Sequence, residues 1–161
     1  MVYIGVGSNM GPRAENCRQA IAALEALDQC RLAACSPLYE TEPVGLKDQA
    51  WFVNGVVRLD TDLAPEGLLG RLRAIERAMG RVRGGPKFGP RVLDLDILFF
   101  DDLMVSKDGL QIPHPRLHER RFVLQPLYDL APDLKHPVLE RTVQSLLNAL
   151  QDGQRVVELC P

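Results

Sequence analysis

Hydrophobic and polar positions form strand-like runs and helical stripes over the first two thirds of the chain. Short apolar runs bounded by turn-forming residues predict strands at residues 2–6, 32–39 and 52–59. Pro37 indicates an edge strand or a bend within the second of these. Apolar residues at helical spacing predict a helix whose apolar face lies within residues 20–27. A second stripe, at residues 65–80, starts with proline and stops at glycine, as helices commonly do.

A fourth strand is predicted at residues 93–100, where alternation gives way to a wholly apolar end. The resulting order, strand-helix-strand-strand-helix-strand, is that of a ferredoxin-like sheet with two helices on one face. We therefore predict an α+β fold with an antiparallel sheet and a C-terminal extension. Within the extension we expect a short strand at residues 104–105, a helix at 143–150 and a strand at 156–159.

Composition favours one small globular domain spanning residues 1–161, since 46% of the residues are hydrophobic. Nineteen basic and twenty-one acidic side chains give a net charge of −2, which provides no overall field for nucleic acid or an anionic membrane. The chain has neither a leader-like start nor a long apolar segment. We expect a soluble, cytoplasmic monomer that binds small molecules.

A basic loop precedes the fourth strand. Arg81, Arg83, Lys87 and Arg91 fall within eleven positions that contain no acidic residue, and the glycines and prolines between them oppose regular structure. Such a loop suits a polyphosphate. No P-loop motif occurs in the sequence, so the phosphates must be held in another way.

Asp94 and Asp96 project from one face of the fourth strand. At roughly 3.3 Å per residue their Cα atoms lie about 6.6 Å apart, and two bare carboxylates at that distance repel by about 2.5 kcal/mol at a dielectric near 20. Magnesium fits such a pair, because it binds one or two carboxylates together with phosphate oxygens. The alternative is a solvated pair on an edge strand, balanced by nearby arginines.

Three other polar residues each allow two interpretations. Asn54, in an apolar strand, either ties down backbone or pairs with the edge of a heterocyclic ligand, and the residue alone favours the structural role. His114, between two prolines, either donates to phosphate or packs in its loop. Glu76 either lies near the basic loop or simply pairs with an arginine.

Several motifs, in the same order, resemble those of the hydroxymethyl-dihydropterin pyrophosphokinases of folate biosynthesis. They are Tyr3-Ile-Gly-Val-Gly-Ser-Asn9, Thr41-x-Pro43-x-Gly45, Phe52-Val-Asn54, Gly80-Arg81-Val-Arg83, Phe88-Gly-Pro-Arg91, Leu93-Asp94-Leu-Asp96-Ile97, and Pro113-His114 with Arg120 and Phe122. The resemblance covers nearly the whole chain. It implies transfer of the β,γ-pyrophosphoryl group of ATP to the hydroxymethyl group of the reduced pterin, with two magnesium ions, leaving AMP.

The resemblance also implies residue roles. Asp94 and Asp96 would bind both magnesium ions, and with Arg81 and Arg91 they form the expected catalytic set. The residues expected to bind ATP are Leu69, Glu76, Arg81, Arg83, Lys87, Arg91, Ile97, Leu110, His114 and Arg120. The residues expected to bind the pterin are Thr41, Pro43, Val44, Phe52, Asn54, Phe88, Asp94 and Phe122. The pterin ring would lie between Phe88 and Phe122.

The sequence departs from the family pattern at Phe88, where tryptophan is frequent, and at Gly109, where some relatives have a cation that Arg116 or Lys107 could replace. Two rival functions remain. Another two-metal nucleotidyl or phosphoryl transferase would use the acid pair similarly, but would leave Asn54 and the aromatic pair unexplained. An RNA-binding module needs exposed aromatic residues and a basic face, which 6% aromatic content and a negative net charge oppose.

Overall fold

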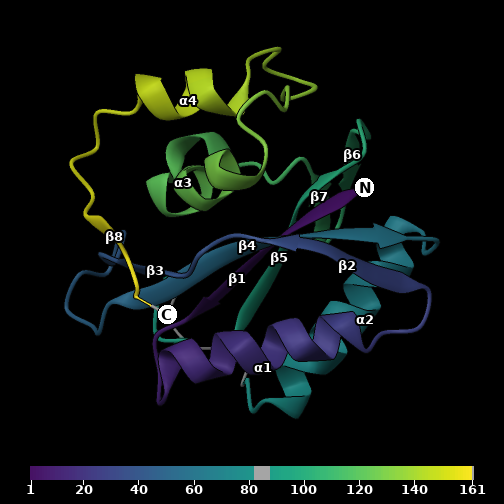
Figure 1. Ribbon diagram of the computed structural model, residues 1–161, viewed down its shortest axis with the longest axis horizontal. Coiled ribbons are helices and arrows are strands. Elements are labelled where there is room, and N and C mark those ends of the chain that lie inside the picture. The colour runs from purple at the N-terminus through teal and green to yellow at the C-terminus, as the bar shows by residue number, and fades with distance from the viewer. Residues whose placement is uncertain (82–87, 161) are drawn as a thin grey trace.

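An antiparallel β-sheet lies at the centre of the molecule, between two layers of helices (Figure 1). The structure is a computed structural model that describes residues 1–81 and 88–160. In this part of the chain the sheet has six strands, with the order β5-β1-β4-β3-β8 and with β2 also paired to β4. They are β1 (Val2–Ser8), β2 (Cys30–Cys35), β3 (Tyr39–Thr41), β4 (Phe52–Thr61), β5 (Asp94–Phe100) and β8 (Val156–Glu158).

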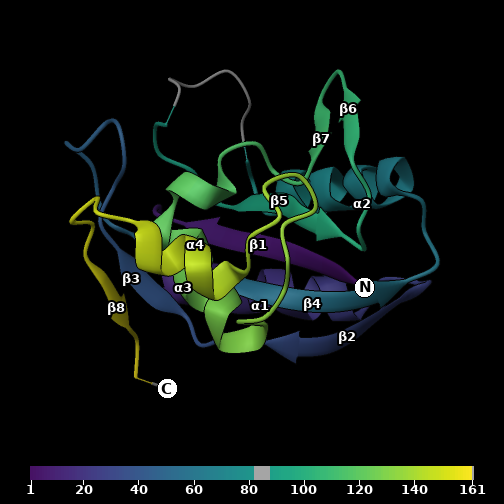
Figure 2. The same cartoon turned by 90° about the horizontal axis from the view of Figure 1, so that it is seen from above.

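Helices cover both faces of this sheet (Figures 1 and 2). Helices α1 (Arg13–Glu25) and α2 (Pro65–Ala78) pack on one face, whereas α3 (Arg121–Leu130) and α4 (Val143–Ala149) lie over the other. A two-stranded hairpin of β6 (Val105–Lys107) and β7 (Leu110–Ile112) stands beside the sheet. The predicted α+β class and antiparallel sheet are confirmed.

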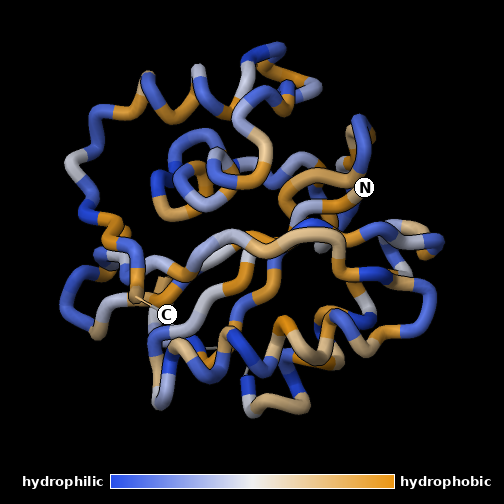
Figure 3. The backbone as a smooth tube through the Cα atoms, viewed as in Figure 1, coloured by the Kyte–Doolittle hydropathy of each residue, from blue (hydrophilic) through white to orange (hydrophobic). Residues whose placement is uncertain are grey.

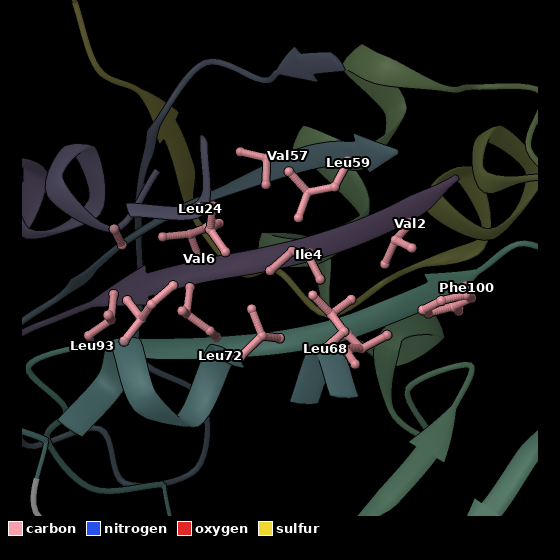
Figure 4. Close-up of a cluster of buried hydrophobic side chains, with 14 of the residues drawn as sticks. Val2, Ile4, Val6, Leu24, Val57, Leu59, Leu68, Leu72, Leu93 and Phe100 are labelled. Atoms are coloured by element: carbon pink, nitrogen blue, oxygen red, sulfur yellow. The ribbon is translucent and has the colours of Figure 1, made fainter. Parts of the chain in front are cut away.

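Alternating side chains of β1 build two separate cores. Val2, Ile4 and Val6 pack with residues of α1 and α2, whereas Tyr3 belongs to the cluster under α3 and α4. Figure 4 shows Ile4 within the first core, close to Leu72 of α2. Hydrophobic and hydrophilic residues interleave along α1 and α2, as one-sided burial of these helices requires (Figure 3).

The second predicted helix is confirmed at both ends. Pro65 occupies the first turn of α2, where its missing N–H has no intrahelical partner to lose. Gly80 follows the helix with φ +91°, the left-handed conformation that ends many helices. Among the described residues, no helix has both the length and the apolar content needed to cross a bilayer.

One predicted strand differs from the structure, and one helix was not predicted. The strand expected at residues 32–39 is divided into β2 and β3 around Pro37, and both parts pair with β4. Helix α3 was not predicted, because it contains Pro126 and has no capping side chain. The strand expected near Val105 is one half of the hairpin of β6 and β7.

Candidate active site

A cleft of about 300 Å³ opens between the central strands and the beginning of α3. Its floor is formed where β1 runs between β4 and β5, with Gly7 opposite Asn54 on one side and opposite Asp94 on the other. The predicted residues that line this cleft are Thr41, Val44, Phe52, Asn54, Arg81, Phe88, Arg91, Asp94, Asp96, His114, Arg120 and Phe122. Most of the predicted site is thus brought together from distant parts of the chain.

A second cavity, the side pocket, adjoins the cleft. It has a volume of about 390 Å³ and includes Leu69, Ile97 and Leu110, three of the residues expected around the nucleoside. Asp96 and His114 line both cavities. Asp96 therefore lies where an aromatic-walled cleft meets a partly apolar pocket, and Asp94 lines the cleft beside it.

Not every predicted residue lies in these two cavities. In the described part of the chain, Pro43 and Glu76 line neither of them. Pro43 is buried at the start of the loop between β3 and β4. Arg83 and Lys87 lie outside the described residues, so their expected roles stay predictions.

Glu76 is buried at 3% exposure and binds Arg81 rather than facing a ligand pocket. Its Oε2 atom accepts a hydrogen bond from Arg81 Nη1 and another, at 3.1 Å, from the backbone N–H of Leu95. The same Arg81 nitrogen donates to Asp94 Oδ1 at 2.6 Å. The structure therefore shows the arginine-pairing alternative, in which Glu76 fixes Arg81 beside the acid pair. The expected role of Glu76 in lining the nucleoside pocket is not seen.

The acid pair carries an unfavourable concentration of negative charge. Burial, and then the neighbouring Asp94 carboxylate, raise the pKa of Asp96 to about 8. A divalent cation would relieve this repulsion, and the donor set, two carboxylates, suits magnesium. Among the described residues no group of three or more histidine, cysteine or acidic side chains gathers as a metal cage. Phosphate oxygens and water would have to complete the coordination.

His114 is held in a neutral, donating form. Its backbone N–H donates to Leu98 O at 3.0 Å, and its Nδ1 atom accepts from the N–H of Arg116 at 3.2 Å. Because Nδ1 accepts, the ring proton of the neutral imidazole resides on Nε2. Burial, and then the positive charge of Arg120, lower the pKa of His114 to about 4. Near neutral pH, His114 can therefore offer an N–H to an anionic oxygen without carrying a charge.

Phe88 and Phe122 supply aromatic surface to the cleft, and an arginine lies over each ring. Arg116 Cζ is 4.9 Å from the centroid of the Phe88 ring, and Arg120 Cζ is 5.5 Å from that of Phe122. Gly45 has φ +81°, and a Cβ atom there would come within 2.9 Å of Phe88 Cδ2. The glycine thus permits the loop between β3 and β4 to pack against Phe88.

Asn54 is bound by another side chain and also lines the cleft. Its Nδ2 atom donates to Thr41 Oγ1 at 2.7 Å, which joins β4 to β3, while its side chain also lines the cleft. Gly7 makes room for it, since a Cβ atom at this position would lie 2.4 Å from Asn54 Oδ1. The amide is therefore positioned by protein and available to a ligand.

Asn9 and Gln49 line neither cavity but bind segments that do, a role for which the sequence did not single them out. Asn9, 4% exposed, donates through Nδ2 to Gln49 Oε1 at 2.9 Å and accepts through Oδ1 from the N–H of Arg91 at 2.7 Å. Gln49 in turn donates to Phe88 O at 2.7 Å. These bonds join the loop between β3 and β4 to the segment that follows the undescribed residues. A polar residue directly after a buried strand was the available signal.

The cations proposed to compensate for Gly109 lie in different places. Lys107 lines the side pocket and binds Glu66 Oε1 at 2.6 Å, whereas Arg116 lines the cleft. A further cation, Arg73, donates to Gly109 O at 3.4 Å. Positive charge is therefore present at this edge of the side pocket without a basic residue at position 109.

Comparison with known proteins agrees with this geometry. The model of the 7,8-dihydro-6-hydroxymethylpterin-pyrophosphokinase family matches residues 3–132. A 2-amino-4-hydroxy-6-hydroxymethyldihydropteridine pyrophosphokinase of Pseudomonas aeruginosa is 50% identical over 136 residues, covering 84% of this chain and 83% of the relative. A protein of the same name from Methylorubrum extorquens is 46% identical over 132 residues, covering 82% of this chain and 83% of the relative.

Larger proteins contain a similar unit. A folic acid synthesis protein of Schizosaccharomyces pombe is 42% identical over 150 residues, which are 93% of this chain but 20% of that protein. A crystal structure of Plasmodium falciparum HPPK-DHPS has a TM-score of 0.70 at 19% identity, covering 91% of this chain and 42% of that one. At this identity the structural likeness shows the fold alone. Because the family model matches most of the chain and a relative of similar length is half identical, the chain belongs to the 7,8-dihydro-6-hydroxymethylpterin-pyrophosphokinase family.

Proposed function

We propose that this protein transfers the β,γ-pyrophosphoryl group of ATP to the hydroxymethyl group of 6-hydroxymethyl-7,8-dihydropterin, giving the pterin diphosphate and AMP. The observation that carries the proposal is that Asp96 lines both of two differently lined cavities, while Asp94 lines the cleft beside it. One cavity offers aromatic walls and an amide to a heterocycle, and the other offers apolar side chains to a nucleoside. The groups that react would meet at the acid pair.

In this proposal Asp94 and Asp96 would hold two magnesium ions. When bound, the ions would neutralise the negative charge of the phosphates. Arg81, fixed by Glu76 and Asp94, would lie beside the transferred group and stabilise its charge during transfer. Arg91 and Arg120 add positive charge to the cleft, while His114 would donate its Nε2–H to a phosphate oxygen. Because these groups are already positioned, catalysis would consist mainly of orientation and charge stabilisation.

The pterin would occupy the aromatic-walled cleft. Phe88 and Phe122 would sandwich its ring, a contact worth about 1 kcal/mol beyond burial. Asn54 would pair with the polar edge of the ring, held in place by its hydrogen bond to Thr41. Val44 and Phe52 would complete the wall. Binding here would direct the hydroxymethyl group toward Asp94 and Asp96.

The finer structural predictions fit the same proposal. The antiparallel order β5-β1-β4-β2, with α1 and α2 on one face, supports a ferredoxin-like unit to which residues 101–161 are added. We infer a single domain over residues 1–161 that acts as a cytoplasmic monomer. Analytical ultracentrifugation would test the oligomeric state.

Identification of the nucleotide product tests the proposed reaction. Purified protein is incubated with ATP, magnesium and hydroxymethyl-dihydropterin, and the nucleotides are separated by ion-exchange chromatography. AMP that forms only when both the pterin and magnesium are present supports the proposal. ADP would instead indicate simple phosphoryl transfer. Free pyrophosphate with an AMP-linked pterin would indicate a nucleotidyl transferase, and either result would refute the pyrophosphokinase assignment.

A further inference from the structure

Arg155 contacts both ends of the loop that joins β3 to β4. Its Nε and Nη2 atoms lie 3.2 and 3.1 Å from Glu42 Oε2, at the start of the loop. Its Cζ atom is 4.7 Å from the ring centroid of Trp51, at the end of the loop. One guanidinium group therefore bridges residues that are nine positions apart in the sequence.

The backbone around Arg155 is also tied to this loop. Strand β8 pairs with β3 at the edge of the sheet, as both Figure 1 and Figure 2 show, and Val156 lies opposite Thr41. The N–H of Glu42 donates to Arg155 O at 3.0 Å, and Gln154 Nε2 donates to Glu42 O at 2.6 Å. The family match ends at residue 132, so the resemblance assigns no role to this segment.

The bridged loop carries part of the cleft wall. Glu42 and Val44 of the loop line the cleft, as does the adjacent Thr41 of β3, and Gly45 packs against Phe88. The loop is also bound by Arg13, whose Nη1 donates to Trp51 O at 2.7 Å. A change in the distance between the two ends of the loop would therefore move the wall against which the pterin is expected to rest.

We propose that Arg155 is a positioning residue for pterin binding, which holds residues 42–51 in the binding conformation by bridging Glu42 and Trp51. The inference rests on the proposed function of the cleft and adds a determinant from the C-terminal segment. Arg155 does not line the cleft or the side pocket, so it would act through the loop and would not touch the substrate.

The test measures the KM values for both substrates in Arg155→Ala. Loss of the bridge should raise the KM for the pterin about fivefold, equivalent to about 1 kcal/mol, while the KM for ATP and kcat change less than about twofold. Arg155→Lys keeps the charge but not the two-nitrogen contact with Glu42, and should fall between wild type and Arg155→Ala.

Arg31→Ala serves as the matched control. Arg31 is an exposed arginine on the same sheet whose Nη2 binds Asp60 Oδ2 at 2.5 Å, and it lines neither of the two cavities. It should leave both KM values unchanged. If Arg155→Ala gave the same pterin KM as Arg31→Ala, the proposal would be overturned, because an exposed ion pair with only a structural role would behave in that way.

Trp51 is the sole tryptophan of the chain, so its fluorescence reports on the bridge without labelling. Time-resolved anisotropy of the substrate-free protein should show a larger fast component in Arg155→Ala than in wild type or Arg31→Ala. Equal decay in all three proteins would overturn the proposal. Absence of AMP formation by the wild type would instead refute the proposed function, whereas the anisotropy would still test whether Arg155 holds the loop.

A double-mutant cycle tests whether Arg155 acts through Glu42. If it does, Glu42→Gln combined with Arg155→Gln should raise the pterin KM no further than Arg155→Gln alone. Fully additive effects would contradict this route.

Discussion

Glu76 offers the most informative perturbation of the site, because it supports Arg81 from inside the protein. Replacement by leucine keeps a similar volume but leaves the N–H of Leu95 without its acceptor and removes one of the two carboxylates that bind Arg81. Removal of one partner from a buried pair costs about 3–5 kcal/mol. Since Arg81 would retain Asp94, we expect the lower limit, about 3 kcal/mol.

Glu76→Gln separates the contribution of the hydrogen bond with Leu95 from that of the negative charge beside Arg81. Glutamine can still accept from Leu95 but carries no charge, so we expect a loss of only about 1 kcal/mol. Burial raises the pKa of Glu76, which means that the folded protein retains this proton to higher pH than the unfolded chain. The stability contribution of this group is therefore complete below the unfolded-state pKa and declines as the pH rises through the folded-state pKa. Glu76→Gln should remove that decline.

Urea unfolding followed by circular dichroism, at several pH values, measures both effects, and steady-state assays of the same variants measure kcat. Both substitutions should lower kcat more than they raise the KM for the pterin, because Arg81 would lose its fixed position. If Glu76→Leu were as stable as wild type, or if the glutamine and leucine variants lost equal stability, the role assigned to the buried carboxylate would be refuted.

Three further changes probe other parts of the site. Gly7→Ala should raise the KM for the pterin about tenfold with little effect on the KM for ATP, because the added Cβ atom, 2.4 Å from Asn54 Oδ1, would displace that side chain. An unchanged pterin KM would contradict the role of Asn54. Arg81→Ala should lower kcat by about 100-fold or more while changing pterin affinity little. Isothermal titration calorimetry measures that affinity, and weakened pterin binding with an unchanged kcat would contradict the role of Arg81. Burial lowers the pKa of His114 to about 4, so this residue contributes fully to the free energy of unfolding above its unfolded-state pKa near 6.5. That contribution is lost as the pH falls through 4. In unfolding experiments across this pH range, His114→Gln should reduce the loss of stability by at most about 3 kcal/mol.

Local chemistry in the sequence was sufficient to predict much of the fold. Pro65 and Gly80 marked the ends of α2 because each favours a backbone conformation that helix ends require. The alternation around Asp94 and Asp96 placed both carboxylates on one face of β5, and both line the cleft. These features depend on neighbouring residues and are therefore accessible to pattern analysis.

Features that depend on tertiary packing were not accessible in this way. Asn9 binds Gln49 and Arg91, which are 40 and 82 residues away, and no local pattern indicates such partners. The helix around Pro126 forms although proline disfavours it, because Leu124 and Leu127 of its apolar face bury against the sheet. The pairing of Glu76 with an arginine was among the sequence-based alternatives, but its second partner, the backbone N–H of Leu95, is not revealed by sequence spacing.

The most direct test of the account is the number of phosphates on the pterin after a single turnover with ATP and magnesium. Mass spectrometry of the product from wild type, Asp94→Ala and Asp96→Ala, each shown to be folded by circular dichroism, distinguishes the possibilities. With the wild type we expect a pterin that gains two phosphates, and with either variant we expect no product. A pterin that gains a single phosphate, or normal turnover by either aspartate variant, would contradict this expectation.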